Sequence, residues 1–322
     1  MLDVGIAIPQ TYNDPAASIG ALRAFMRRAE DAGMHSLWVQ EQLIGRDQSF
    51  EPLVTLAYAA ALTDRVRLCS ATFIAPVRNP IVFAKSLASV DQLSQGRLTV
   101  GISVGDMRTL YPASGVSIAD RGRRIEELVE VMRRLWTEKT VTFSGRFFTL
   151  EAASMEPKPV QRPHPPIWFG GHSELALRRA VRLGDGWIGA GGRSIAEFGA
   201  AAAGLRALLT EAERSEFTIA KKLYLAIGRS RDEAFEGLRR WFEVHWGATD
   251  GGAFASRVGV CGTPAEVVEQ IVETWRLGAD LVICNPVFDE PEQLEVIARE
   301  ILPAVRARTA DARADQSGSV RR

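Results

Sequence analysis

Two adjacent glycines separate an apolar run from a helical pattern in the segment PIWFGGHSELALRRAVRLGDGWIG, residues 166–189. Glycine lets the backbone approach a ligand closely, and the first N–H groups of a helix have no partner inside that helix. Gly170 and Gly171, with the hydroxyl of Ser173 as a further donor, therefore form a candidate anion site. A tight turn with Ser173 as the helix N-cap is the simpler alternative.

Two carboxylic residues follow apolar runs and could move a proton. Glu41 comes after the run SLWVQ (36–40), and Asp106 follows the run RLTVGIS (97–103). Burial can raise the pKa of such a group toward neutrality, which suits a general acid or base. Glu41 could equally be a carboxylate bonded to loop backbone, and Asp106 a turn or N-cap residue.

These residues must be positioned by regular elements, and the chain shows apolar runs that alternate with amphipathic helices. Asp14-Pro15 and Asn79-Pro80 are helix starts, and VTFSGRFFTL (141–150) predicts a surface hairpin that turns at Ser144-Gly145. The expected strands are 4–8, 36–40, 66–73, 97–103, 166–170, 187–190, 223–228 and 280–285, and the last expected helix is 292–307.

About eight strands separated by helices must pair in parallel, which predicts an α/β fold, a (β/α)8 TIM barrel with insertion loops at its C-terminal face. A doubly wound open sheet is the main competitor, but no GxGxxG motif follows the first strand. Residues 1–307 are expected to form a single domain. The polar tail, residues 308–322, is expected to be disordered.

Composition excludes several function classes. Lys+Arg and Asp+Glu are both 39, so the formal net charge is zero and a general nucleic-acid binder is not expected. No signal peptide or membrane-spanning run is found, and no histidine, cysteine or carboxylate spacing indicates a metal. Three scattered cysteines, Cys69, Cys261 and Cys284, point to a reducing cytoplasm.

The glycine segment resembles the phosphate loop of the bacterial-luciferase-like flavin and deazaflavin oxidoreductases. Residues 76–105, 121–150 and 262–286 are similar to the same family, so that the resemblance reaches from the first strands to about residue 306. It implies a flavin-type ring across the barrel mouth, and a non-prolyl cis peptide within Ser70-Ala71-Thr72 that contacts the ring. The cofactor-binding residues that it implies are Ser70, Ala71, Thr72, Ser103, Gly170, Gly171, His172, Ser173 and Gly189.

For function, the resemblance implies hydride transfer between coenzyme F-420 and a small organic substrate, with Glu41 and Asp106 handling the proton. The deazaflavin-dependent relatives usually place histidine after the acidic residue, whereas this chain has Gln42, whose amide cannot exchange a proton near neutral pH. Three arginines, Arg78, Arg108 and Arg193, lie in or near mouth loops. One of them could pair with a cofactor tail, or all could be solvated surface residues.

Three other functions stay open. One is a monooxygenase that uses reduced FMN supplied by a partner reductase, since FMN shares the ring-and-phosphate anatomy of F-420. Another is a flavin-binding protein without catalysis, and a third is a barrel that binds a sugar phosphate. The resemblance also implies a homodimer, for which the apolar faces of helices 52–62 and 80–94 could supply the interface.

Overall fold

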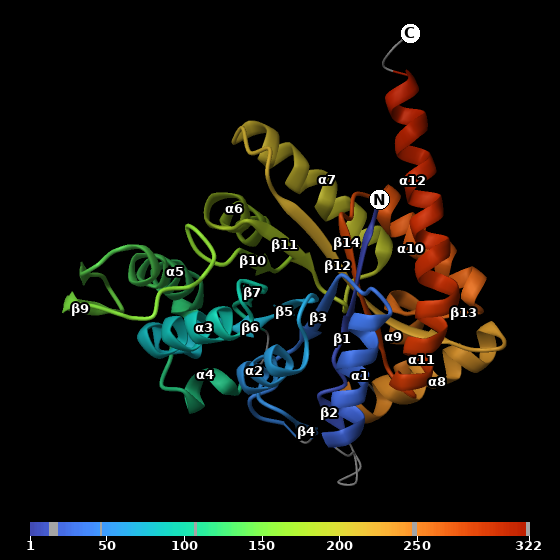
Figure 1. Cartoon of the computed structure of the whole chain (residues 1–322), viewed down its shortest axis with the longest axis horizontal. Coiled ribbons are helices and arrows are strands. Elements are labelled where there is room, and N and C mark those ends of the chain that lie inside the picture. The colour runs from blue at the N-terminus through green and yellow to red at the C-terminus, as the bar shows by residue number, and fades with distance from the viewer. Residues whose placement is uncertain (13–18, 46, 106–107, 247–249, 320–322) are drawn as a thin grey trace. The chain divides into compact units, whose positions relative to one another are not determined.

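The computed structural model describes residues 1–12, 19–45, 47–105, 108–246 and 250–319 (Figure 1). Its main strands are β1 (Asp3–Ala7), β3 (Ser36–Val39), β5 (Arg67–Ser70), β7 (Leu98–Ser103), β10 (Ile167–Gly170), β11 (Gly186–Gly189), β12 (Thr218–Ile227) and β14 (Leu281–Pro286). Hydrogen bonding joins them in the order β10-β11-β12-β14-β1-β3-β5-β7, and β10 also pairs with β7. Within the described residues these eight strands close a parallel ring, which confirms the (β/α)8 barrel and leaves no open-sheet edge.

Helices connect the strands and begin where the sequence supplies capping groups. The Asn79 side chain accepts hydrogen bonds from the N–H groups of Ile81 and Val82, and Ser194 and Thr263 each form a capping box. The Asp14-Pro15 signal lies outside the described residues. The connecting helices are α1 (Ile19–Asp31), α2 (Pro52–Leu62), α3 (Pro80–Leu93), α5 (Arg121–Thr137), α6 (Glu174–Leu183), α7 (Ile195–Glu211) and α10 (Pro264–Arg276).

Short insertions follow several strands. The predicted hairpin is confirmed as β8 (Val141–Ser144) and β9 (Thr149–Ala153), and the Glu127 carboxylate accepts the N–H groups of Phe147 and Phe148 in its turn. The other insertions are β2 (Thr11–Tyr12), β4 (Gln48–Ser49), β6 (Phe73–Ile74), α4 (Leu110–Ala113), α8 (Arg231–Trp246), α9 (Gly251–Val258) and β13 (Val260–Gly262), with 3-10 turns at Ala75–Val77 and Ile118–Asp120.

Three predicted elements differ from the observed ones. The expected strand 66–73 is divided into β5 and β6, and the expected strand 223–228 begins earlier, at Thr218. The last expected helix consists of α11 (Glu290–Val296), a π-helical turn (Ile297–Ile301) and α12 (Leu302–Ser319). It therefore continues past the predicted domain boundary at residue 307. Thr309 is buried, and its Oγ1 accepts a hydrogen bond from the N–H of Leu2 at 3.1 Å.

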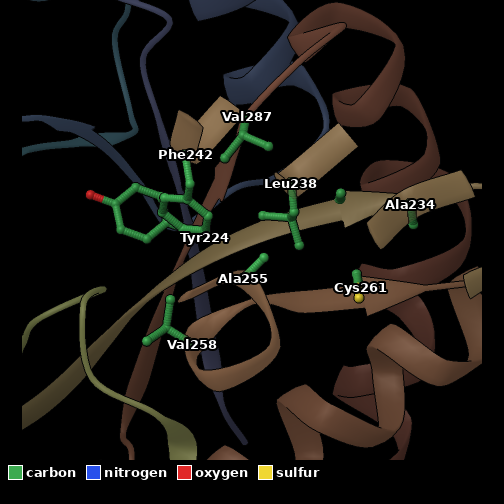
Figure 2. Packing of buried hydrophobic residues seen from close by; sticks show 9 residues of the cluster. Tyr224, Ala234, Leu238, Phe242, Ala255, Val258, Cys261 and Val287 are labelled. Carbon is green, nitrogen blue, oxygen red and sulfur yellow. The ribbon is translucent and has the colours of Figure 1, made fainter. Parts of the chain in front are cut away.

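The chain divides into two compact units. The terminal unit comprises Met1–Pro9, Ser18–Leu37 and Ile188–Arg322, and the central unit comprises Gln10–Ala17 and Trp38–Trp187. In the terminal unit, α8 and α9 pack on the end of β12. Their shared core is Tyr224, Ala226, Ala234, Leu238, Phe242, Ala255, Val258, Cys261 and Val287. Figure 2 shows the Phe242 ring against Tyr224, whose hydroxyl points away from the other labelled side chains.

Each unit contains the same two-bond link between an aspartate and an isoleucine. In the central unit, the Ile167 N–H donates to Asp185 Oδ2 at 2.8 Å, and the Asp185 N–H donates to the Ile167 carbonyl at 2.7 Å. In the terminal unit, Ile219 and Asp280 make the equivalent bonds at 2.9 and 2.8 Å. Each aspartate precedes a strand, β11 or β14, so the two links fix where those strands begin.

The three cysteines, Cys69, Cys261 and Cys284, are buried and carry free thiols. Among the described helices, none combines the length and the apolar character needed to cross a membrane.

Candidate active site

Three candidate residues meet at the ends of strands in the central unit. Thr72 Oγ1 donates a hydrogen bond to Ser103 Oγ at 2.7 Å, and Ser103 Oγ also accepts the N–H of Gly105 at 3.2 Å. A Cβ placed on Gly170 would lie 3.2 Å from Ser103 Cβ and 3.3 Å from Thr72 Cγ2. Gly170 is therefore explained first by this close approach of three chain segments.

A non-prolyl cis peptide bond joins Ala71 and Thr72, within the three residues for which the family resemblance implies one. Ser70 lies just before it and is buried. Its hydroxyl donates to the Gly101 carbonyl at 2.9 Å and accepts from the Gly101 N–H at 2.9 Å. The Ser70 side chain thus links β5 to β7 and has no second proton to donate, so it supports the site and its direct cofactor contact stays a prediction.

Gly171 adopts a backbone conformation that favours glycine, with φ +120°, and a Cβ there would lie 2.8 Å from Ala176 Cβ in the first turn of α6. Its carbonyl accepts a hydrogen bond from Trp187 Nε1 at 2.7 Å. The ring of His172 packs edge-on against the same indole, with centroids 5.2 Å apart. Trp187 therefore holds the glycine loop in place and would report on its occupancy.

Ser173 is the N-cap of α6, and its Oγ accepts the N–H of Ala176 at 3.3 Å. The N–H groups of Glu174 and Leu175 begin the helix and have no acceptor within it, so they are donors suited to an anion. Glu174 places a carboxylate in this first turn, but that side chain is exposed and paired with Arg178 at 2.9 Å. Both interpretations of the glycine pair, a capped turn and an anion cradle, fit this local structure.

Glu41 lies directly after β3 and its side chain is 0% exposed. Its two oxygens accept hydrogen bonds from the N–H of Ile74 and from Nη2 of Arg78. Burial raises the pKa of Glu41, and the positive charge of Arg78 opposes that rise without cancelling it. Glu41 therefore bonds to loop backbone, which was one of its two predicted roles. The raised pKa lets its carboxyl hold a proton at a higher pH than an exposed glutamate, and its role in catalysis stays a prediction.

Arg78 is not a solvated surface residue, and its pairing with a cofactor tail stays a prediction. Its side chain is 15% exposed and forms ion pairs with Glu41 and, at 3.1 Å, with Glu51. The guanidinium carbon lies 5.1 Å from the ring centroid of Phe73 and 4.9 Å from that of Phe83. The sequence contained the residues of this cluster but not the pairing, because they lie on separate segments.

Gln42, which stands where deazaflavin relatives usually have histidine, is turned toward its own loop. Its amide nitrogen lies 3.4 Å from Asp47 Oδ2. A Cβ on Gly45 would approach that nitrogen to 2.1 Å, so glycine is required for this placement. Gln42 thus supplies no group that can exchange a proton near neutral pH.

Sequence reasoning missed Gln10, which fixes the end of β3. The side chain of Gln10 is buried, and its amide bonds the backbone of Gln40 twice, accepting from the N–H at 2.8 Å and donating to the carbonyl at 2.7 Å. It also donates to the Phe50 carbonyl at 3.0 Å. Because Gln40 directly precedes Glu41, Gln10 positions that carboxylate. The only sequence signal was an amide residue at the end of an apolar run.

Two buried lysines in the terminal unit were also missed. Lys221 Nζ donates to the carbonyls of Ala190 and Arg193, both at 2.6 Å, and burial lowers its pKa to about 7. Lys222 lies 3.4 Å from the Tyr224 hydroxyl, and burial lowers its pKa to about 7 as well. Successive residues of a strand face opposite sides, so the two ammonium groups occupy different environments.

Gly189, the remaining glycine of the predicted site, belongs to the terminal unit. A Cβ there would lie 2.6 Å from the Phe198 ring and 3.4 Å from Lys221 Cδ, so packing within that unit explains the glycine, and its cofactor role stays a prediction. Asp106 lies outside the described residues. Among the residues that the structure describes, no group of three or more histidine, cysteine or carboxylic side chains could hold a metal ion.

Comparison with known proteins agrees with this geometry. The model of the luciferase-like monooxygenase family matches residues 4–281. The chain belongs to this family. It is therefore an enzyme of the luciferase-like oxidoreductase and monooxygenase group, as its sequence resemblance implies.

Particular relatives differ in the cofactor that they use. The chain is 29% identical over 299 residues to an FMNH2-dependent dimethylsulfone monooxygenase of Pseudomonas putida, which covers 81% of this chain and 80% of that protein. Among solved structures, it is similar to the monooxygenase RslO1 from Streptomyces bottropensis, with a TM-score of 0.83, 24% identity and coverage of 94% and 99%. It is also similar to an F420-dependent secondary alcohol dehydrogenase, with a TM-score of 0.82, 21% identity and the same coverage. Two of these proteins are named for flavin-type cofactors, FMNH2 in one and F420 in the other.

Proposed function

We propose that this protein is a monooxygenase that uses reduced FMN, delivered by a separate flavin reductase, to oxidise a small organic substrate. The observation that carries the choice of FMN is the orientation of Gln42. A proton-exchanging histidine is absent at that position, and the amide faces Gly45 and Asp47. The likeness to an FMNH2-dependent monooxygenase, over 81% of this chain and 80% of that protein, supports the same choice. The sequence alone favoured F-420, and these two observations reverse that order.

The residues of the central unit fit such a cofactor. In this proposal the small side chain of Ala71, beside the cis peptide, would leave room for a flat ring, and the glycine loop would offer donors for its phosphate. In this proposal the N–H groups of Glu174 and Leu175 and the Ser173 hydroxyl bind the phosphate, and Gly171 allows its close approach. The bound flavin supplies the redox chemistry, while Glu41 holds or releases a proton at its carboxyl.

Hydride transfer with F-420 is the second candidate, and the burial of Glu41 favours it. A carboxyl whose pKa is raised by burial can exchange a proton with an alcohol or a carbonyl substrate. A flavin-binding protein without turnover is the outcome if neither cofactor supports a reaction. Residence in the cytoplasm and assembly as a homodimer also stay proposals.

Anaerobic titration with reduced FMN and, separately, with reduced F-420 tests the choice. Tryptophan fluorescence is a suitable signal, because the Trp187 indole bonds to the glycine loop. We expect reduced FMN to bind at least about tenfold more tightly, a difference of about 1.4 kcal/mol. Tight binding of F-420 alone would reverse the proposal. An oxygen-dependent assay with a flavin reductase and dimethylsulfone as the first probe then tests for monooxygenation.

A further inference from the structure

One guanidinium is shared by two carboxylates in the central unit. Nη2 of Arg78 donates to Glu41, whose side chain is fully buried, and to Glu51, whose side chain is 36% exposed. The two glutamates come from different segments, since Glu41 follows β3 and Glu51 precedes α2. Among the described residues, these are the charged groups that act on Glu41: Arg78 attracts its negative form, and Glu51 repels it.

The position of Arg78 does not depend on Glu41 alone. Phe73 and Phe83 are buried, they contact each other edge-on with centroids 5.2 Å apart, and the guanidinium lies against both rings. The backbone N–H of Arg78 also donates to the Ala75 carbonyl at 3.0 Å. Arg78 is therefore held in place from several sides, and it would stay beside Glu41 if that carboxyl became neutral.

Glu51 is held by the start of α2 as well as by Arg78. It is the N-cap of α2, where its Oε2 accepts the N–H of Val54 at 2.8 Å while its Oε1 faces Arg78. The same carboxylate thus caps a helix and neutralises a guanidinium. Leaving a buried guanidinium unpaired is costly, so a second anion beside Arg78 matters most when the first anion is lost.

We propose that Arg78 and Glu51 are positioning residues that allow Glu41 to gain and lose a proton while the buried guanidinium remains neutralised. When Glu41 is charged, it shares Arg78 with Glu51. When Glu41 takes up a proton, Glu51 alone balances Arg78, and no side chain has to move. The inference rests on the proposed function, in which Glu41 is the proton-holding group, and it assigns that group the partners that set its charge.

The directions of the expected shifts follow from charge. Removing the negative charge of Glu51 leaves Arg78 to Glu41 alone, which stabilises charged Glu41 and lowers its pKa. Removing the positive charge of Arg78 leaves burial unopposed and raises the pKa of Glu41 further. The variant Glu51→Gln retains an oxygen that can cap α2, so it changes the charge with little change in the helix start.

The test is a carboxyl titration that does not depend on turnover. Protein with 13C-labelled glutamate carboxyls is titrated by NMR, and the Glu41 signal is assigned by its loss in Glu41→Gln. We expect the titration midpoint of Glu41 to be higher in Arg78→Met than in wild type, and lower in Glu51→Gln than in wild type. Glu233→Gln is the matched control, because Glu233 also accepts a backbone N–H and pairs with an arginine but is remote in sequence and exposed.

The outcomes separate the inference from the proposed function. A Glu41 midpoint in Glu51→Gln that equals or exceeds that of wild type overturns the inference. If Arg78→Met does not fold, as judged by its thermal melt, the comparison of Glu51→Gln with wild type decides alone. If the ranking holds but Glu41→Gln oxidises dimethylsulfone as fast as wild type, the acid–base role of Glu41 fails while the charge coupling stands.

Discussion

The hydroxyl of Thr72 donates a hydrogen bond to the hydroxyl of Ser103 at 2.7 Å, and the Cα of Gly170 faces this pair. The pair joins the residue after the cis peptide to the end of β7. The hydrogen bond thus fixes the side chain of Thr72, which would lie beside a bound ring in the proposed function. Small or hydroxyl side chains meet here because three backbone segments approach more closely than larger residues would permit.

Thr72→Val tests this pair with almost no change in volume. Loss of one hydrogen bond costs about 1 kcal/mol, so we expect the dissociation constant of reduced FMN to rise about fivefold. Thr210→Val is the control, because Thr210 Oγ1 bonds only its own helix, at the carbonyl of Arg206. Equal affinity in Thr72→Val and Thr210→Val would show that the pair does not orient the cofactor.

Gly171→Ala separates the two interpretations of the glycine loop. The positive φ and the approach to Ala176 make alanine costly, and we expect the free energy of unfolding to fall by about 1–3 kcal/mol in urea titrations. Gly204→Ala in α7 is the control, since a Cβ there meets nothing within 4 Å. If Gly171 serves an anion, the folded variant also binds reduced FMN at least about tenfold more weakly. Unchanged affinity at lowered stability would indicate a turn and nothing more.

Lys222→Met should change how stability depends on pH. Burial lowers the pKa of Lys222 to about 7 from the 10.5 of an exposed lysine, so between these values the unfolded chain binds the extra proton. The contribution of Lys222 to the free energy of unfolding then rises with pH across this window, by up to about 1.4 kcal/mol per pH unit. Below pH 7 the buried lysine is charged, and its burial destabilises the folded protein by the full amount.

We therefore expect Lys222→Met to exceed wild type in free energy of unfolding by the largest amount near about pH 6–7. This difference should shrink as the pH rises toward about 9. Urea titrations at several pH values measure it. Lys139→Met is the control, because Lys139 is exposed. A difference between Lys222→Met and wild type that is constant with pH would mean that the ammonium is not desolvated in the folded protein.

Apolar side chains on α2 and α3 predict the interface of the proposed homodimer. Val54 is 68% exposed and Val82 is 65% exposed, each near the start of its helix, and the two helices pack together. We expect sedimentation to show a dimer that Val82→Asp converts to a monomer. Val244→Asp on α8 is the control, since Val244 is 66% exposed. A Val82→Asp protein that still sediments as a dimer would place the interface elsewhere.

Local signals in the sequence were sufficient for most of the fold. Asn79-Pro80 predicts the start of α3 because capping depends on a few adjacent residues. The predicted start of β12, at residue 223, was too late because the true start at Thr218 depends on contacts that are not local in sequence. The predicted strand 223–228 leaves out Lys221 and Lys222, and lysine is rarely buried. The carbonyl and phenol groups that these lysines contact become their neighbours only in the folded protein.

The sequence indicated several residues of the candidate site but not the contacts between them. Glu41 and the glycine loop could be selected because their residue types follow apolar runs. The partners that set their behaviour, Arg78 and Trp187, become neighbours only through tertiary contacts. Gly170 shows the same limit, since the sequence suggested a ligand as the reason for glycine, whereas Thr72 and Ser103 supply a reason that folding alone reveals.

The paired bonds of Asp185 with Ile167 and of Asp280 with Ile219 have a consequence for assembly of the chain. Parallel strands have no tight turn to align them, so a slip by one residue would reverse which side chains face inward. Each of the two units has its own aspartate, Asp185 or Asp280, whose paired bonds oppose such a slip. Both bonds of each link lie within one unit, so contacts inside that unit set the register at the link.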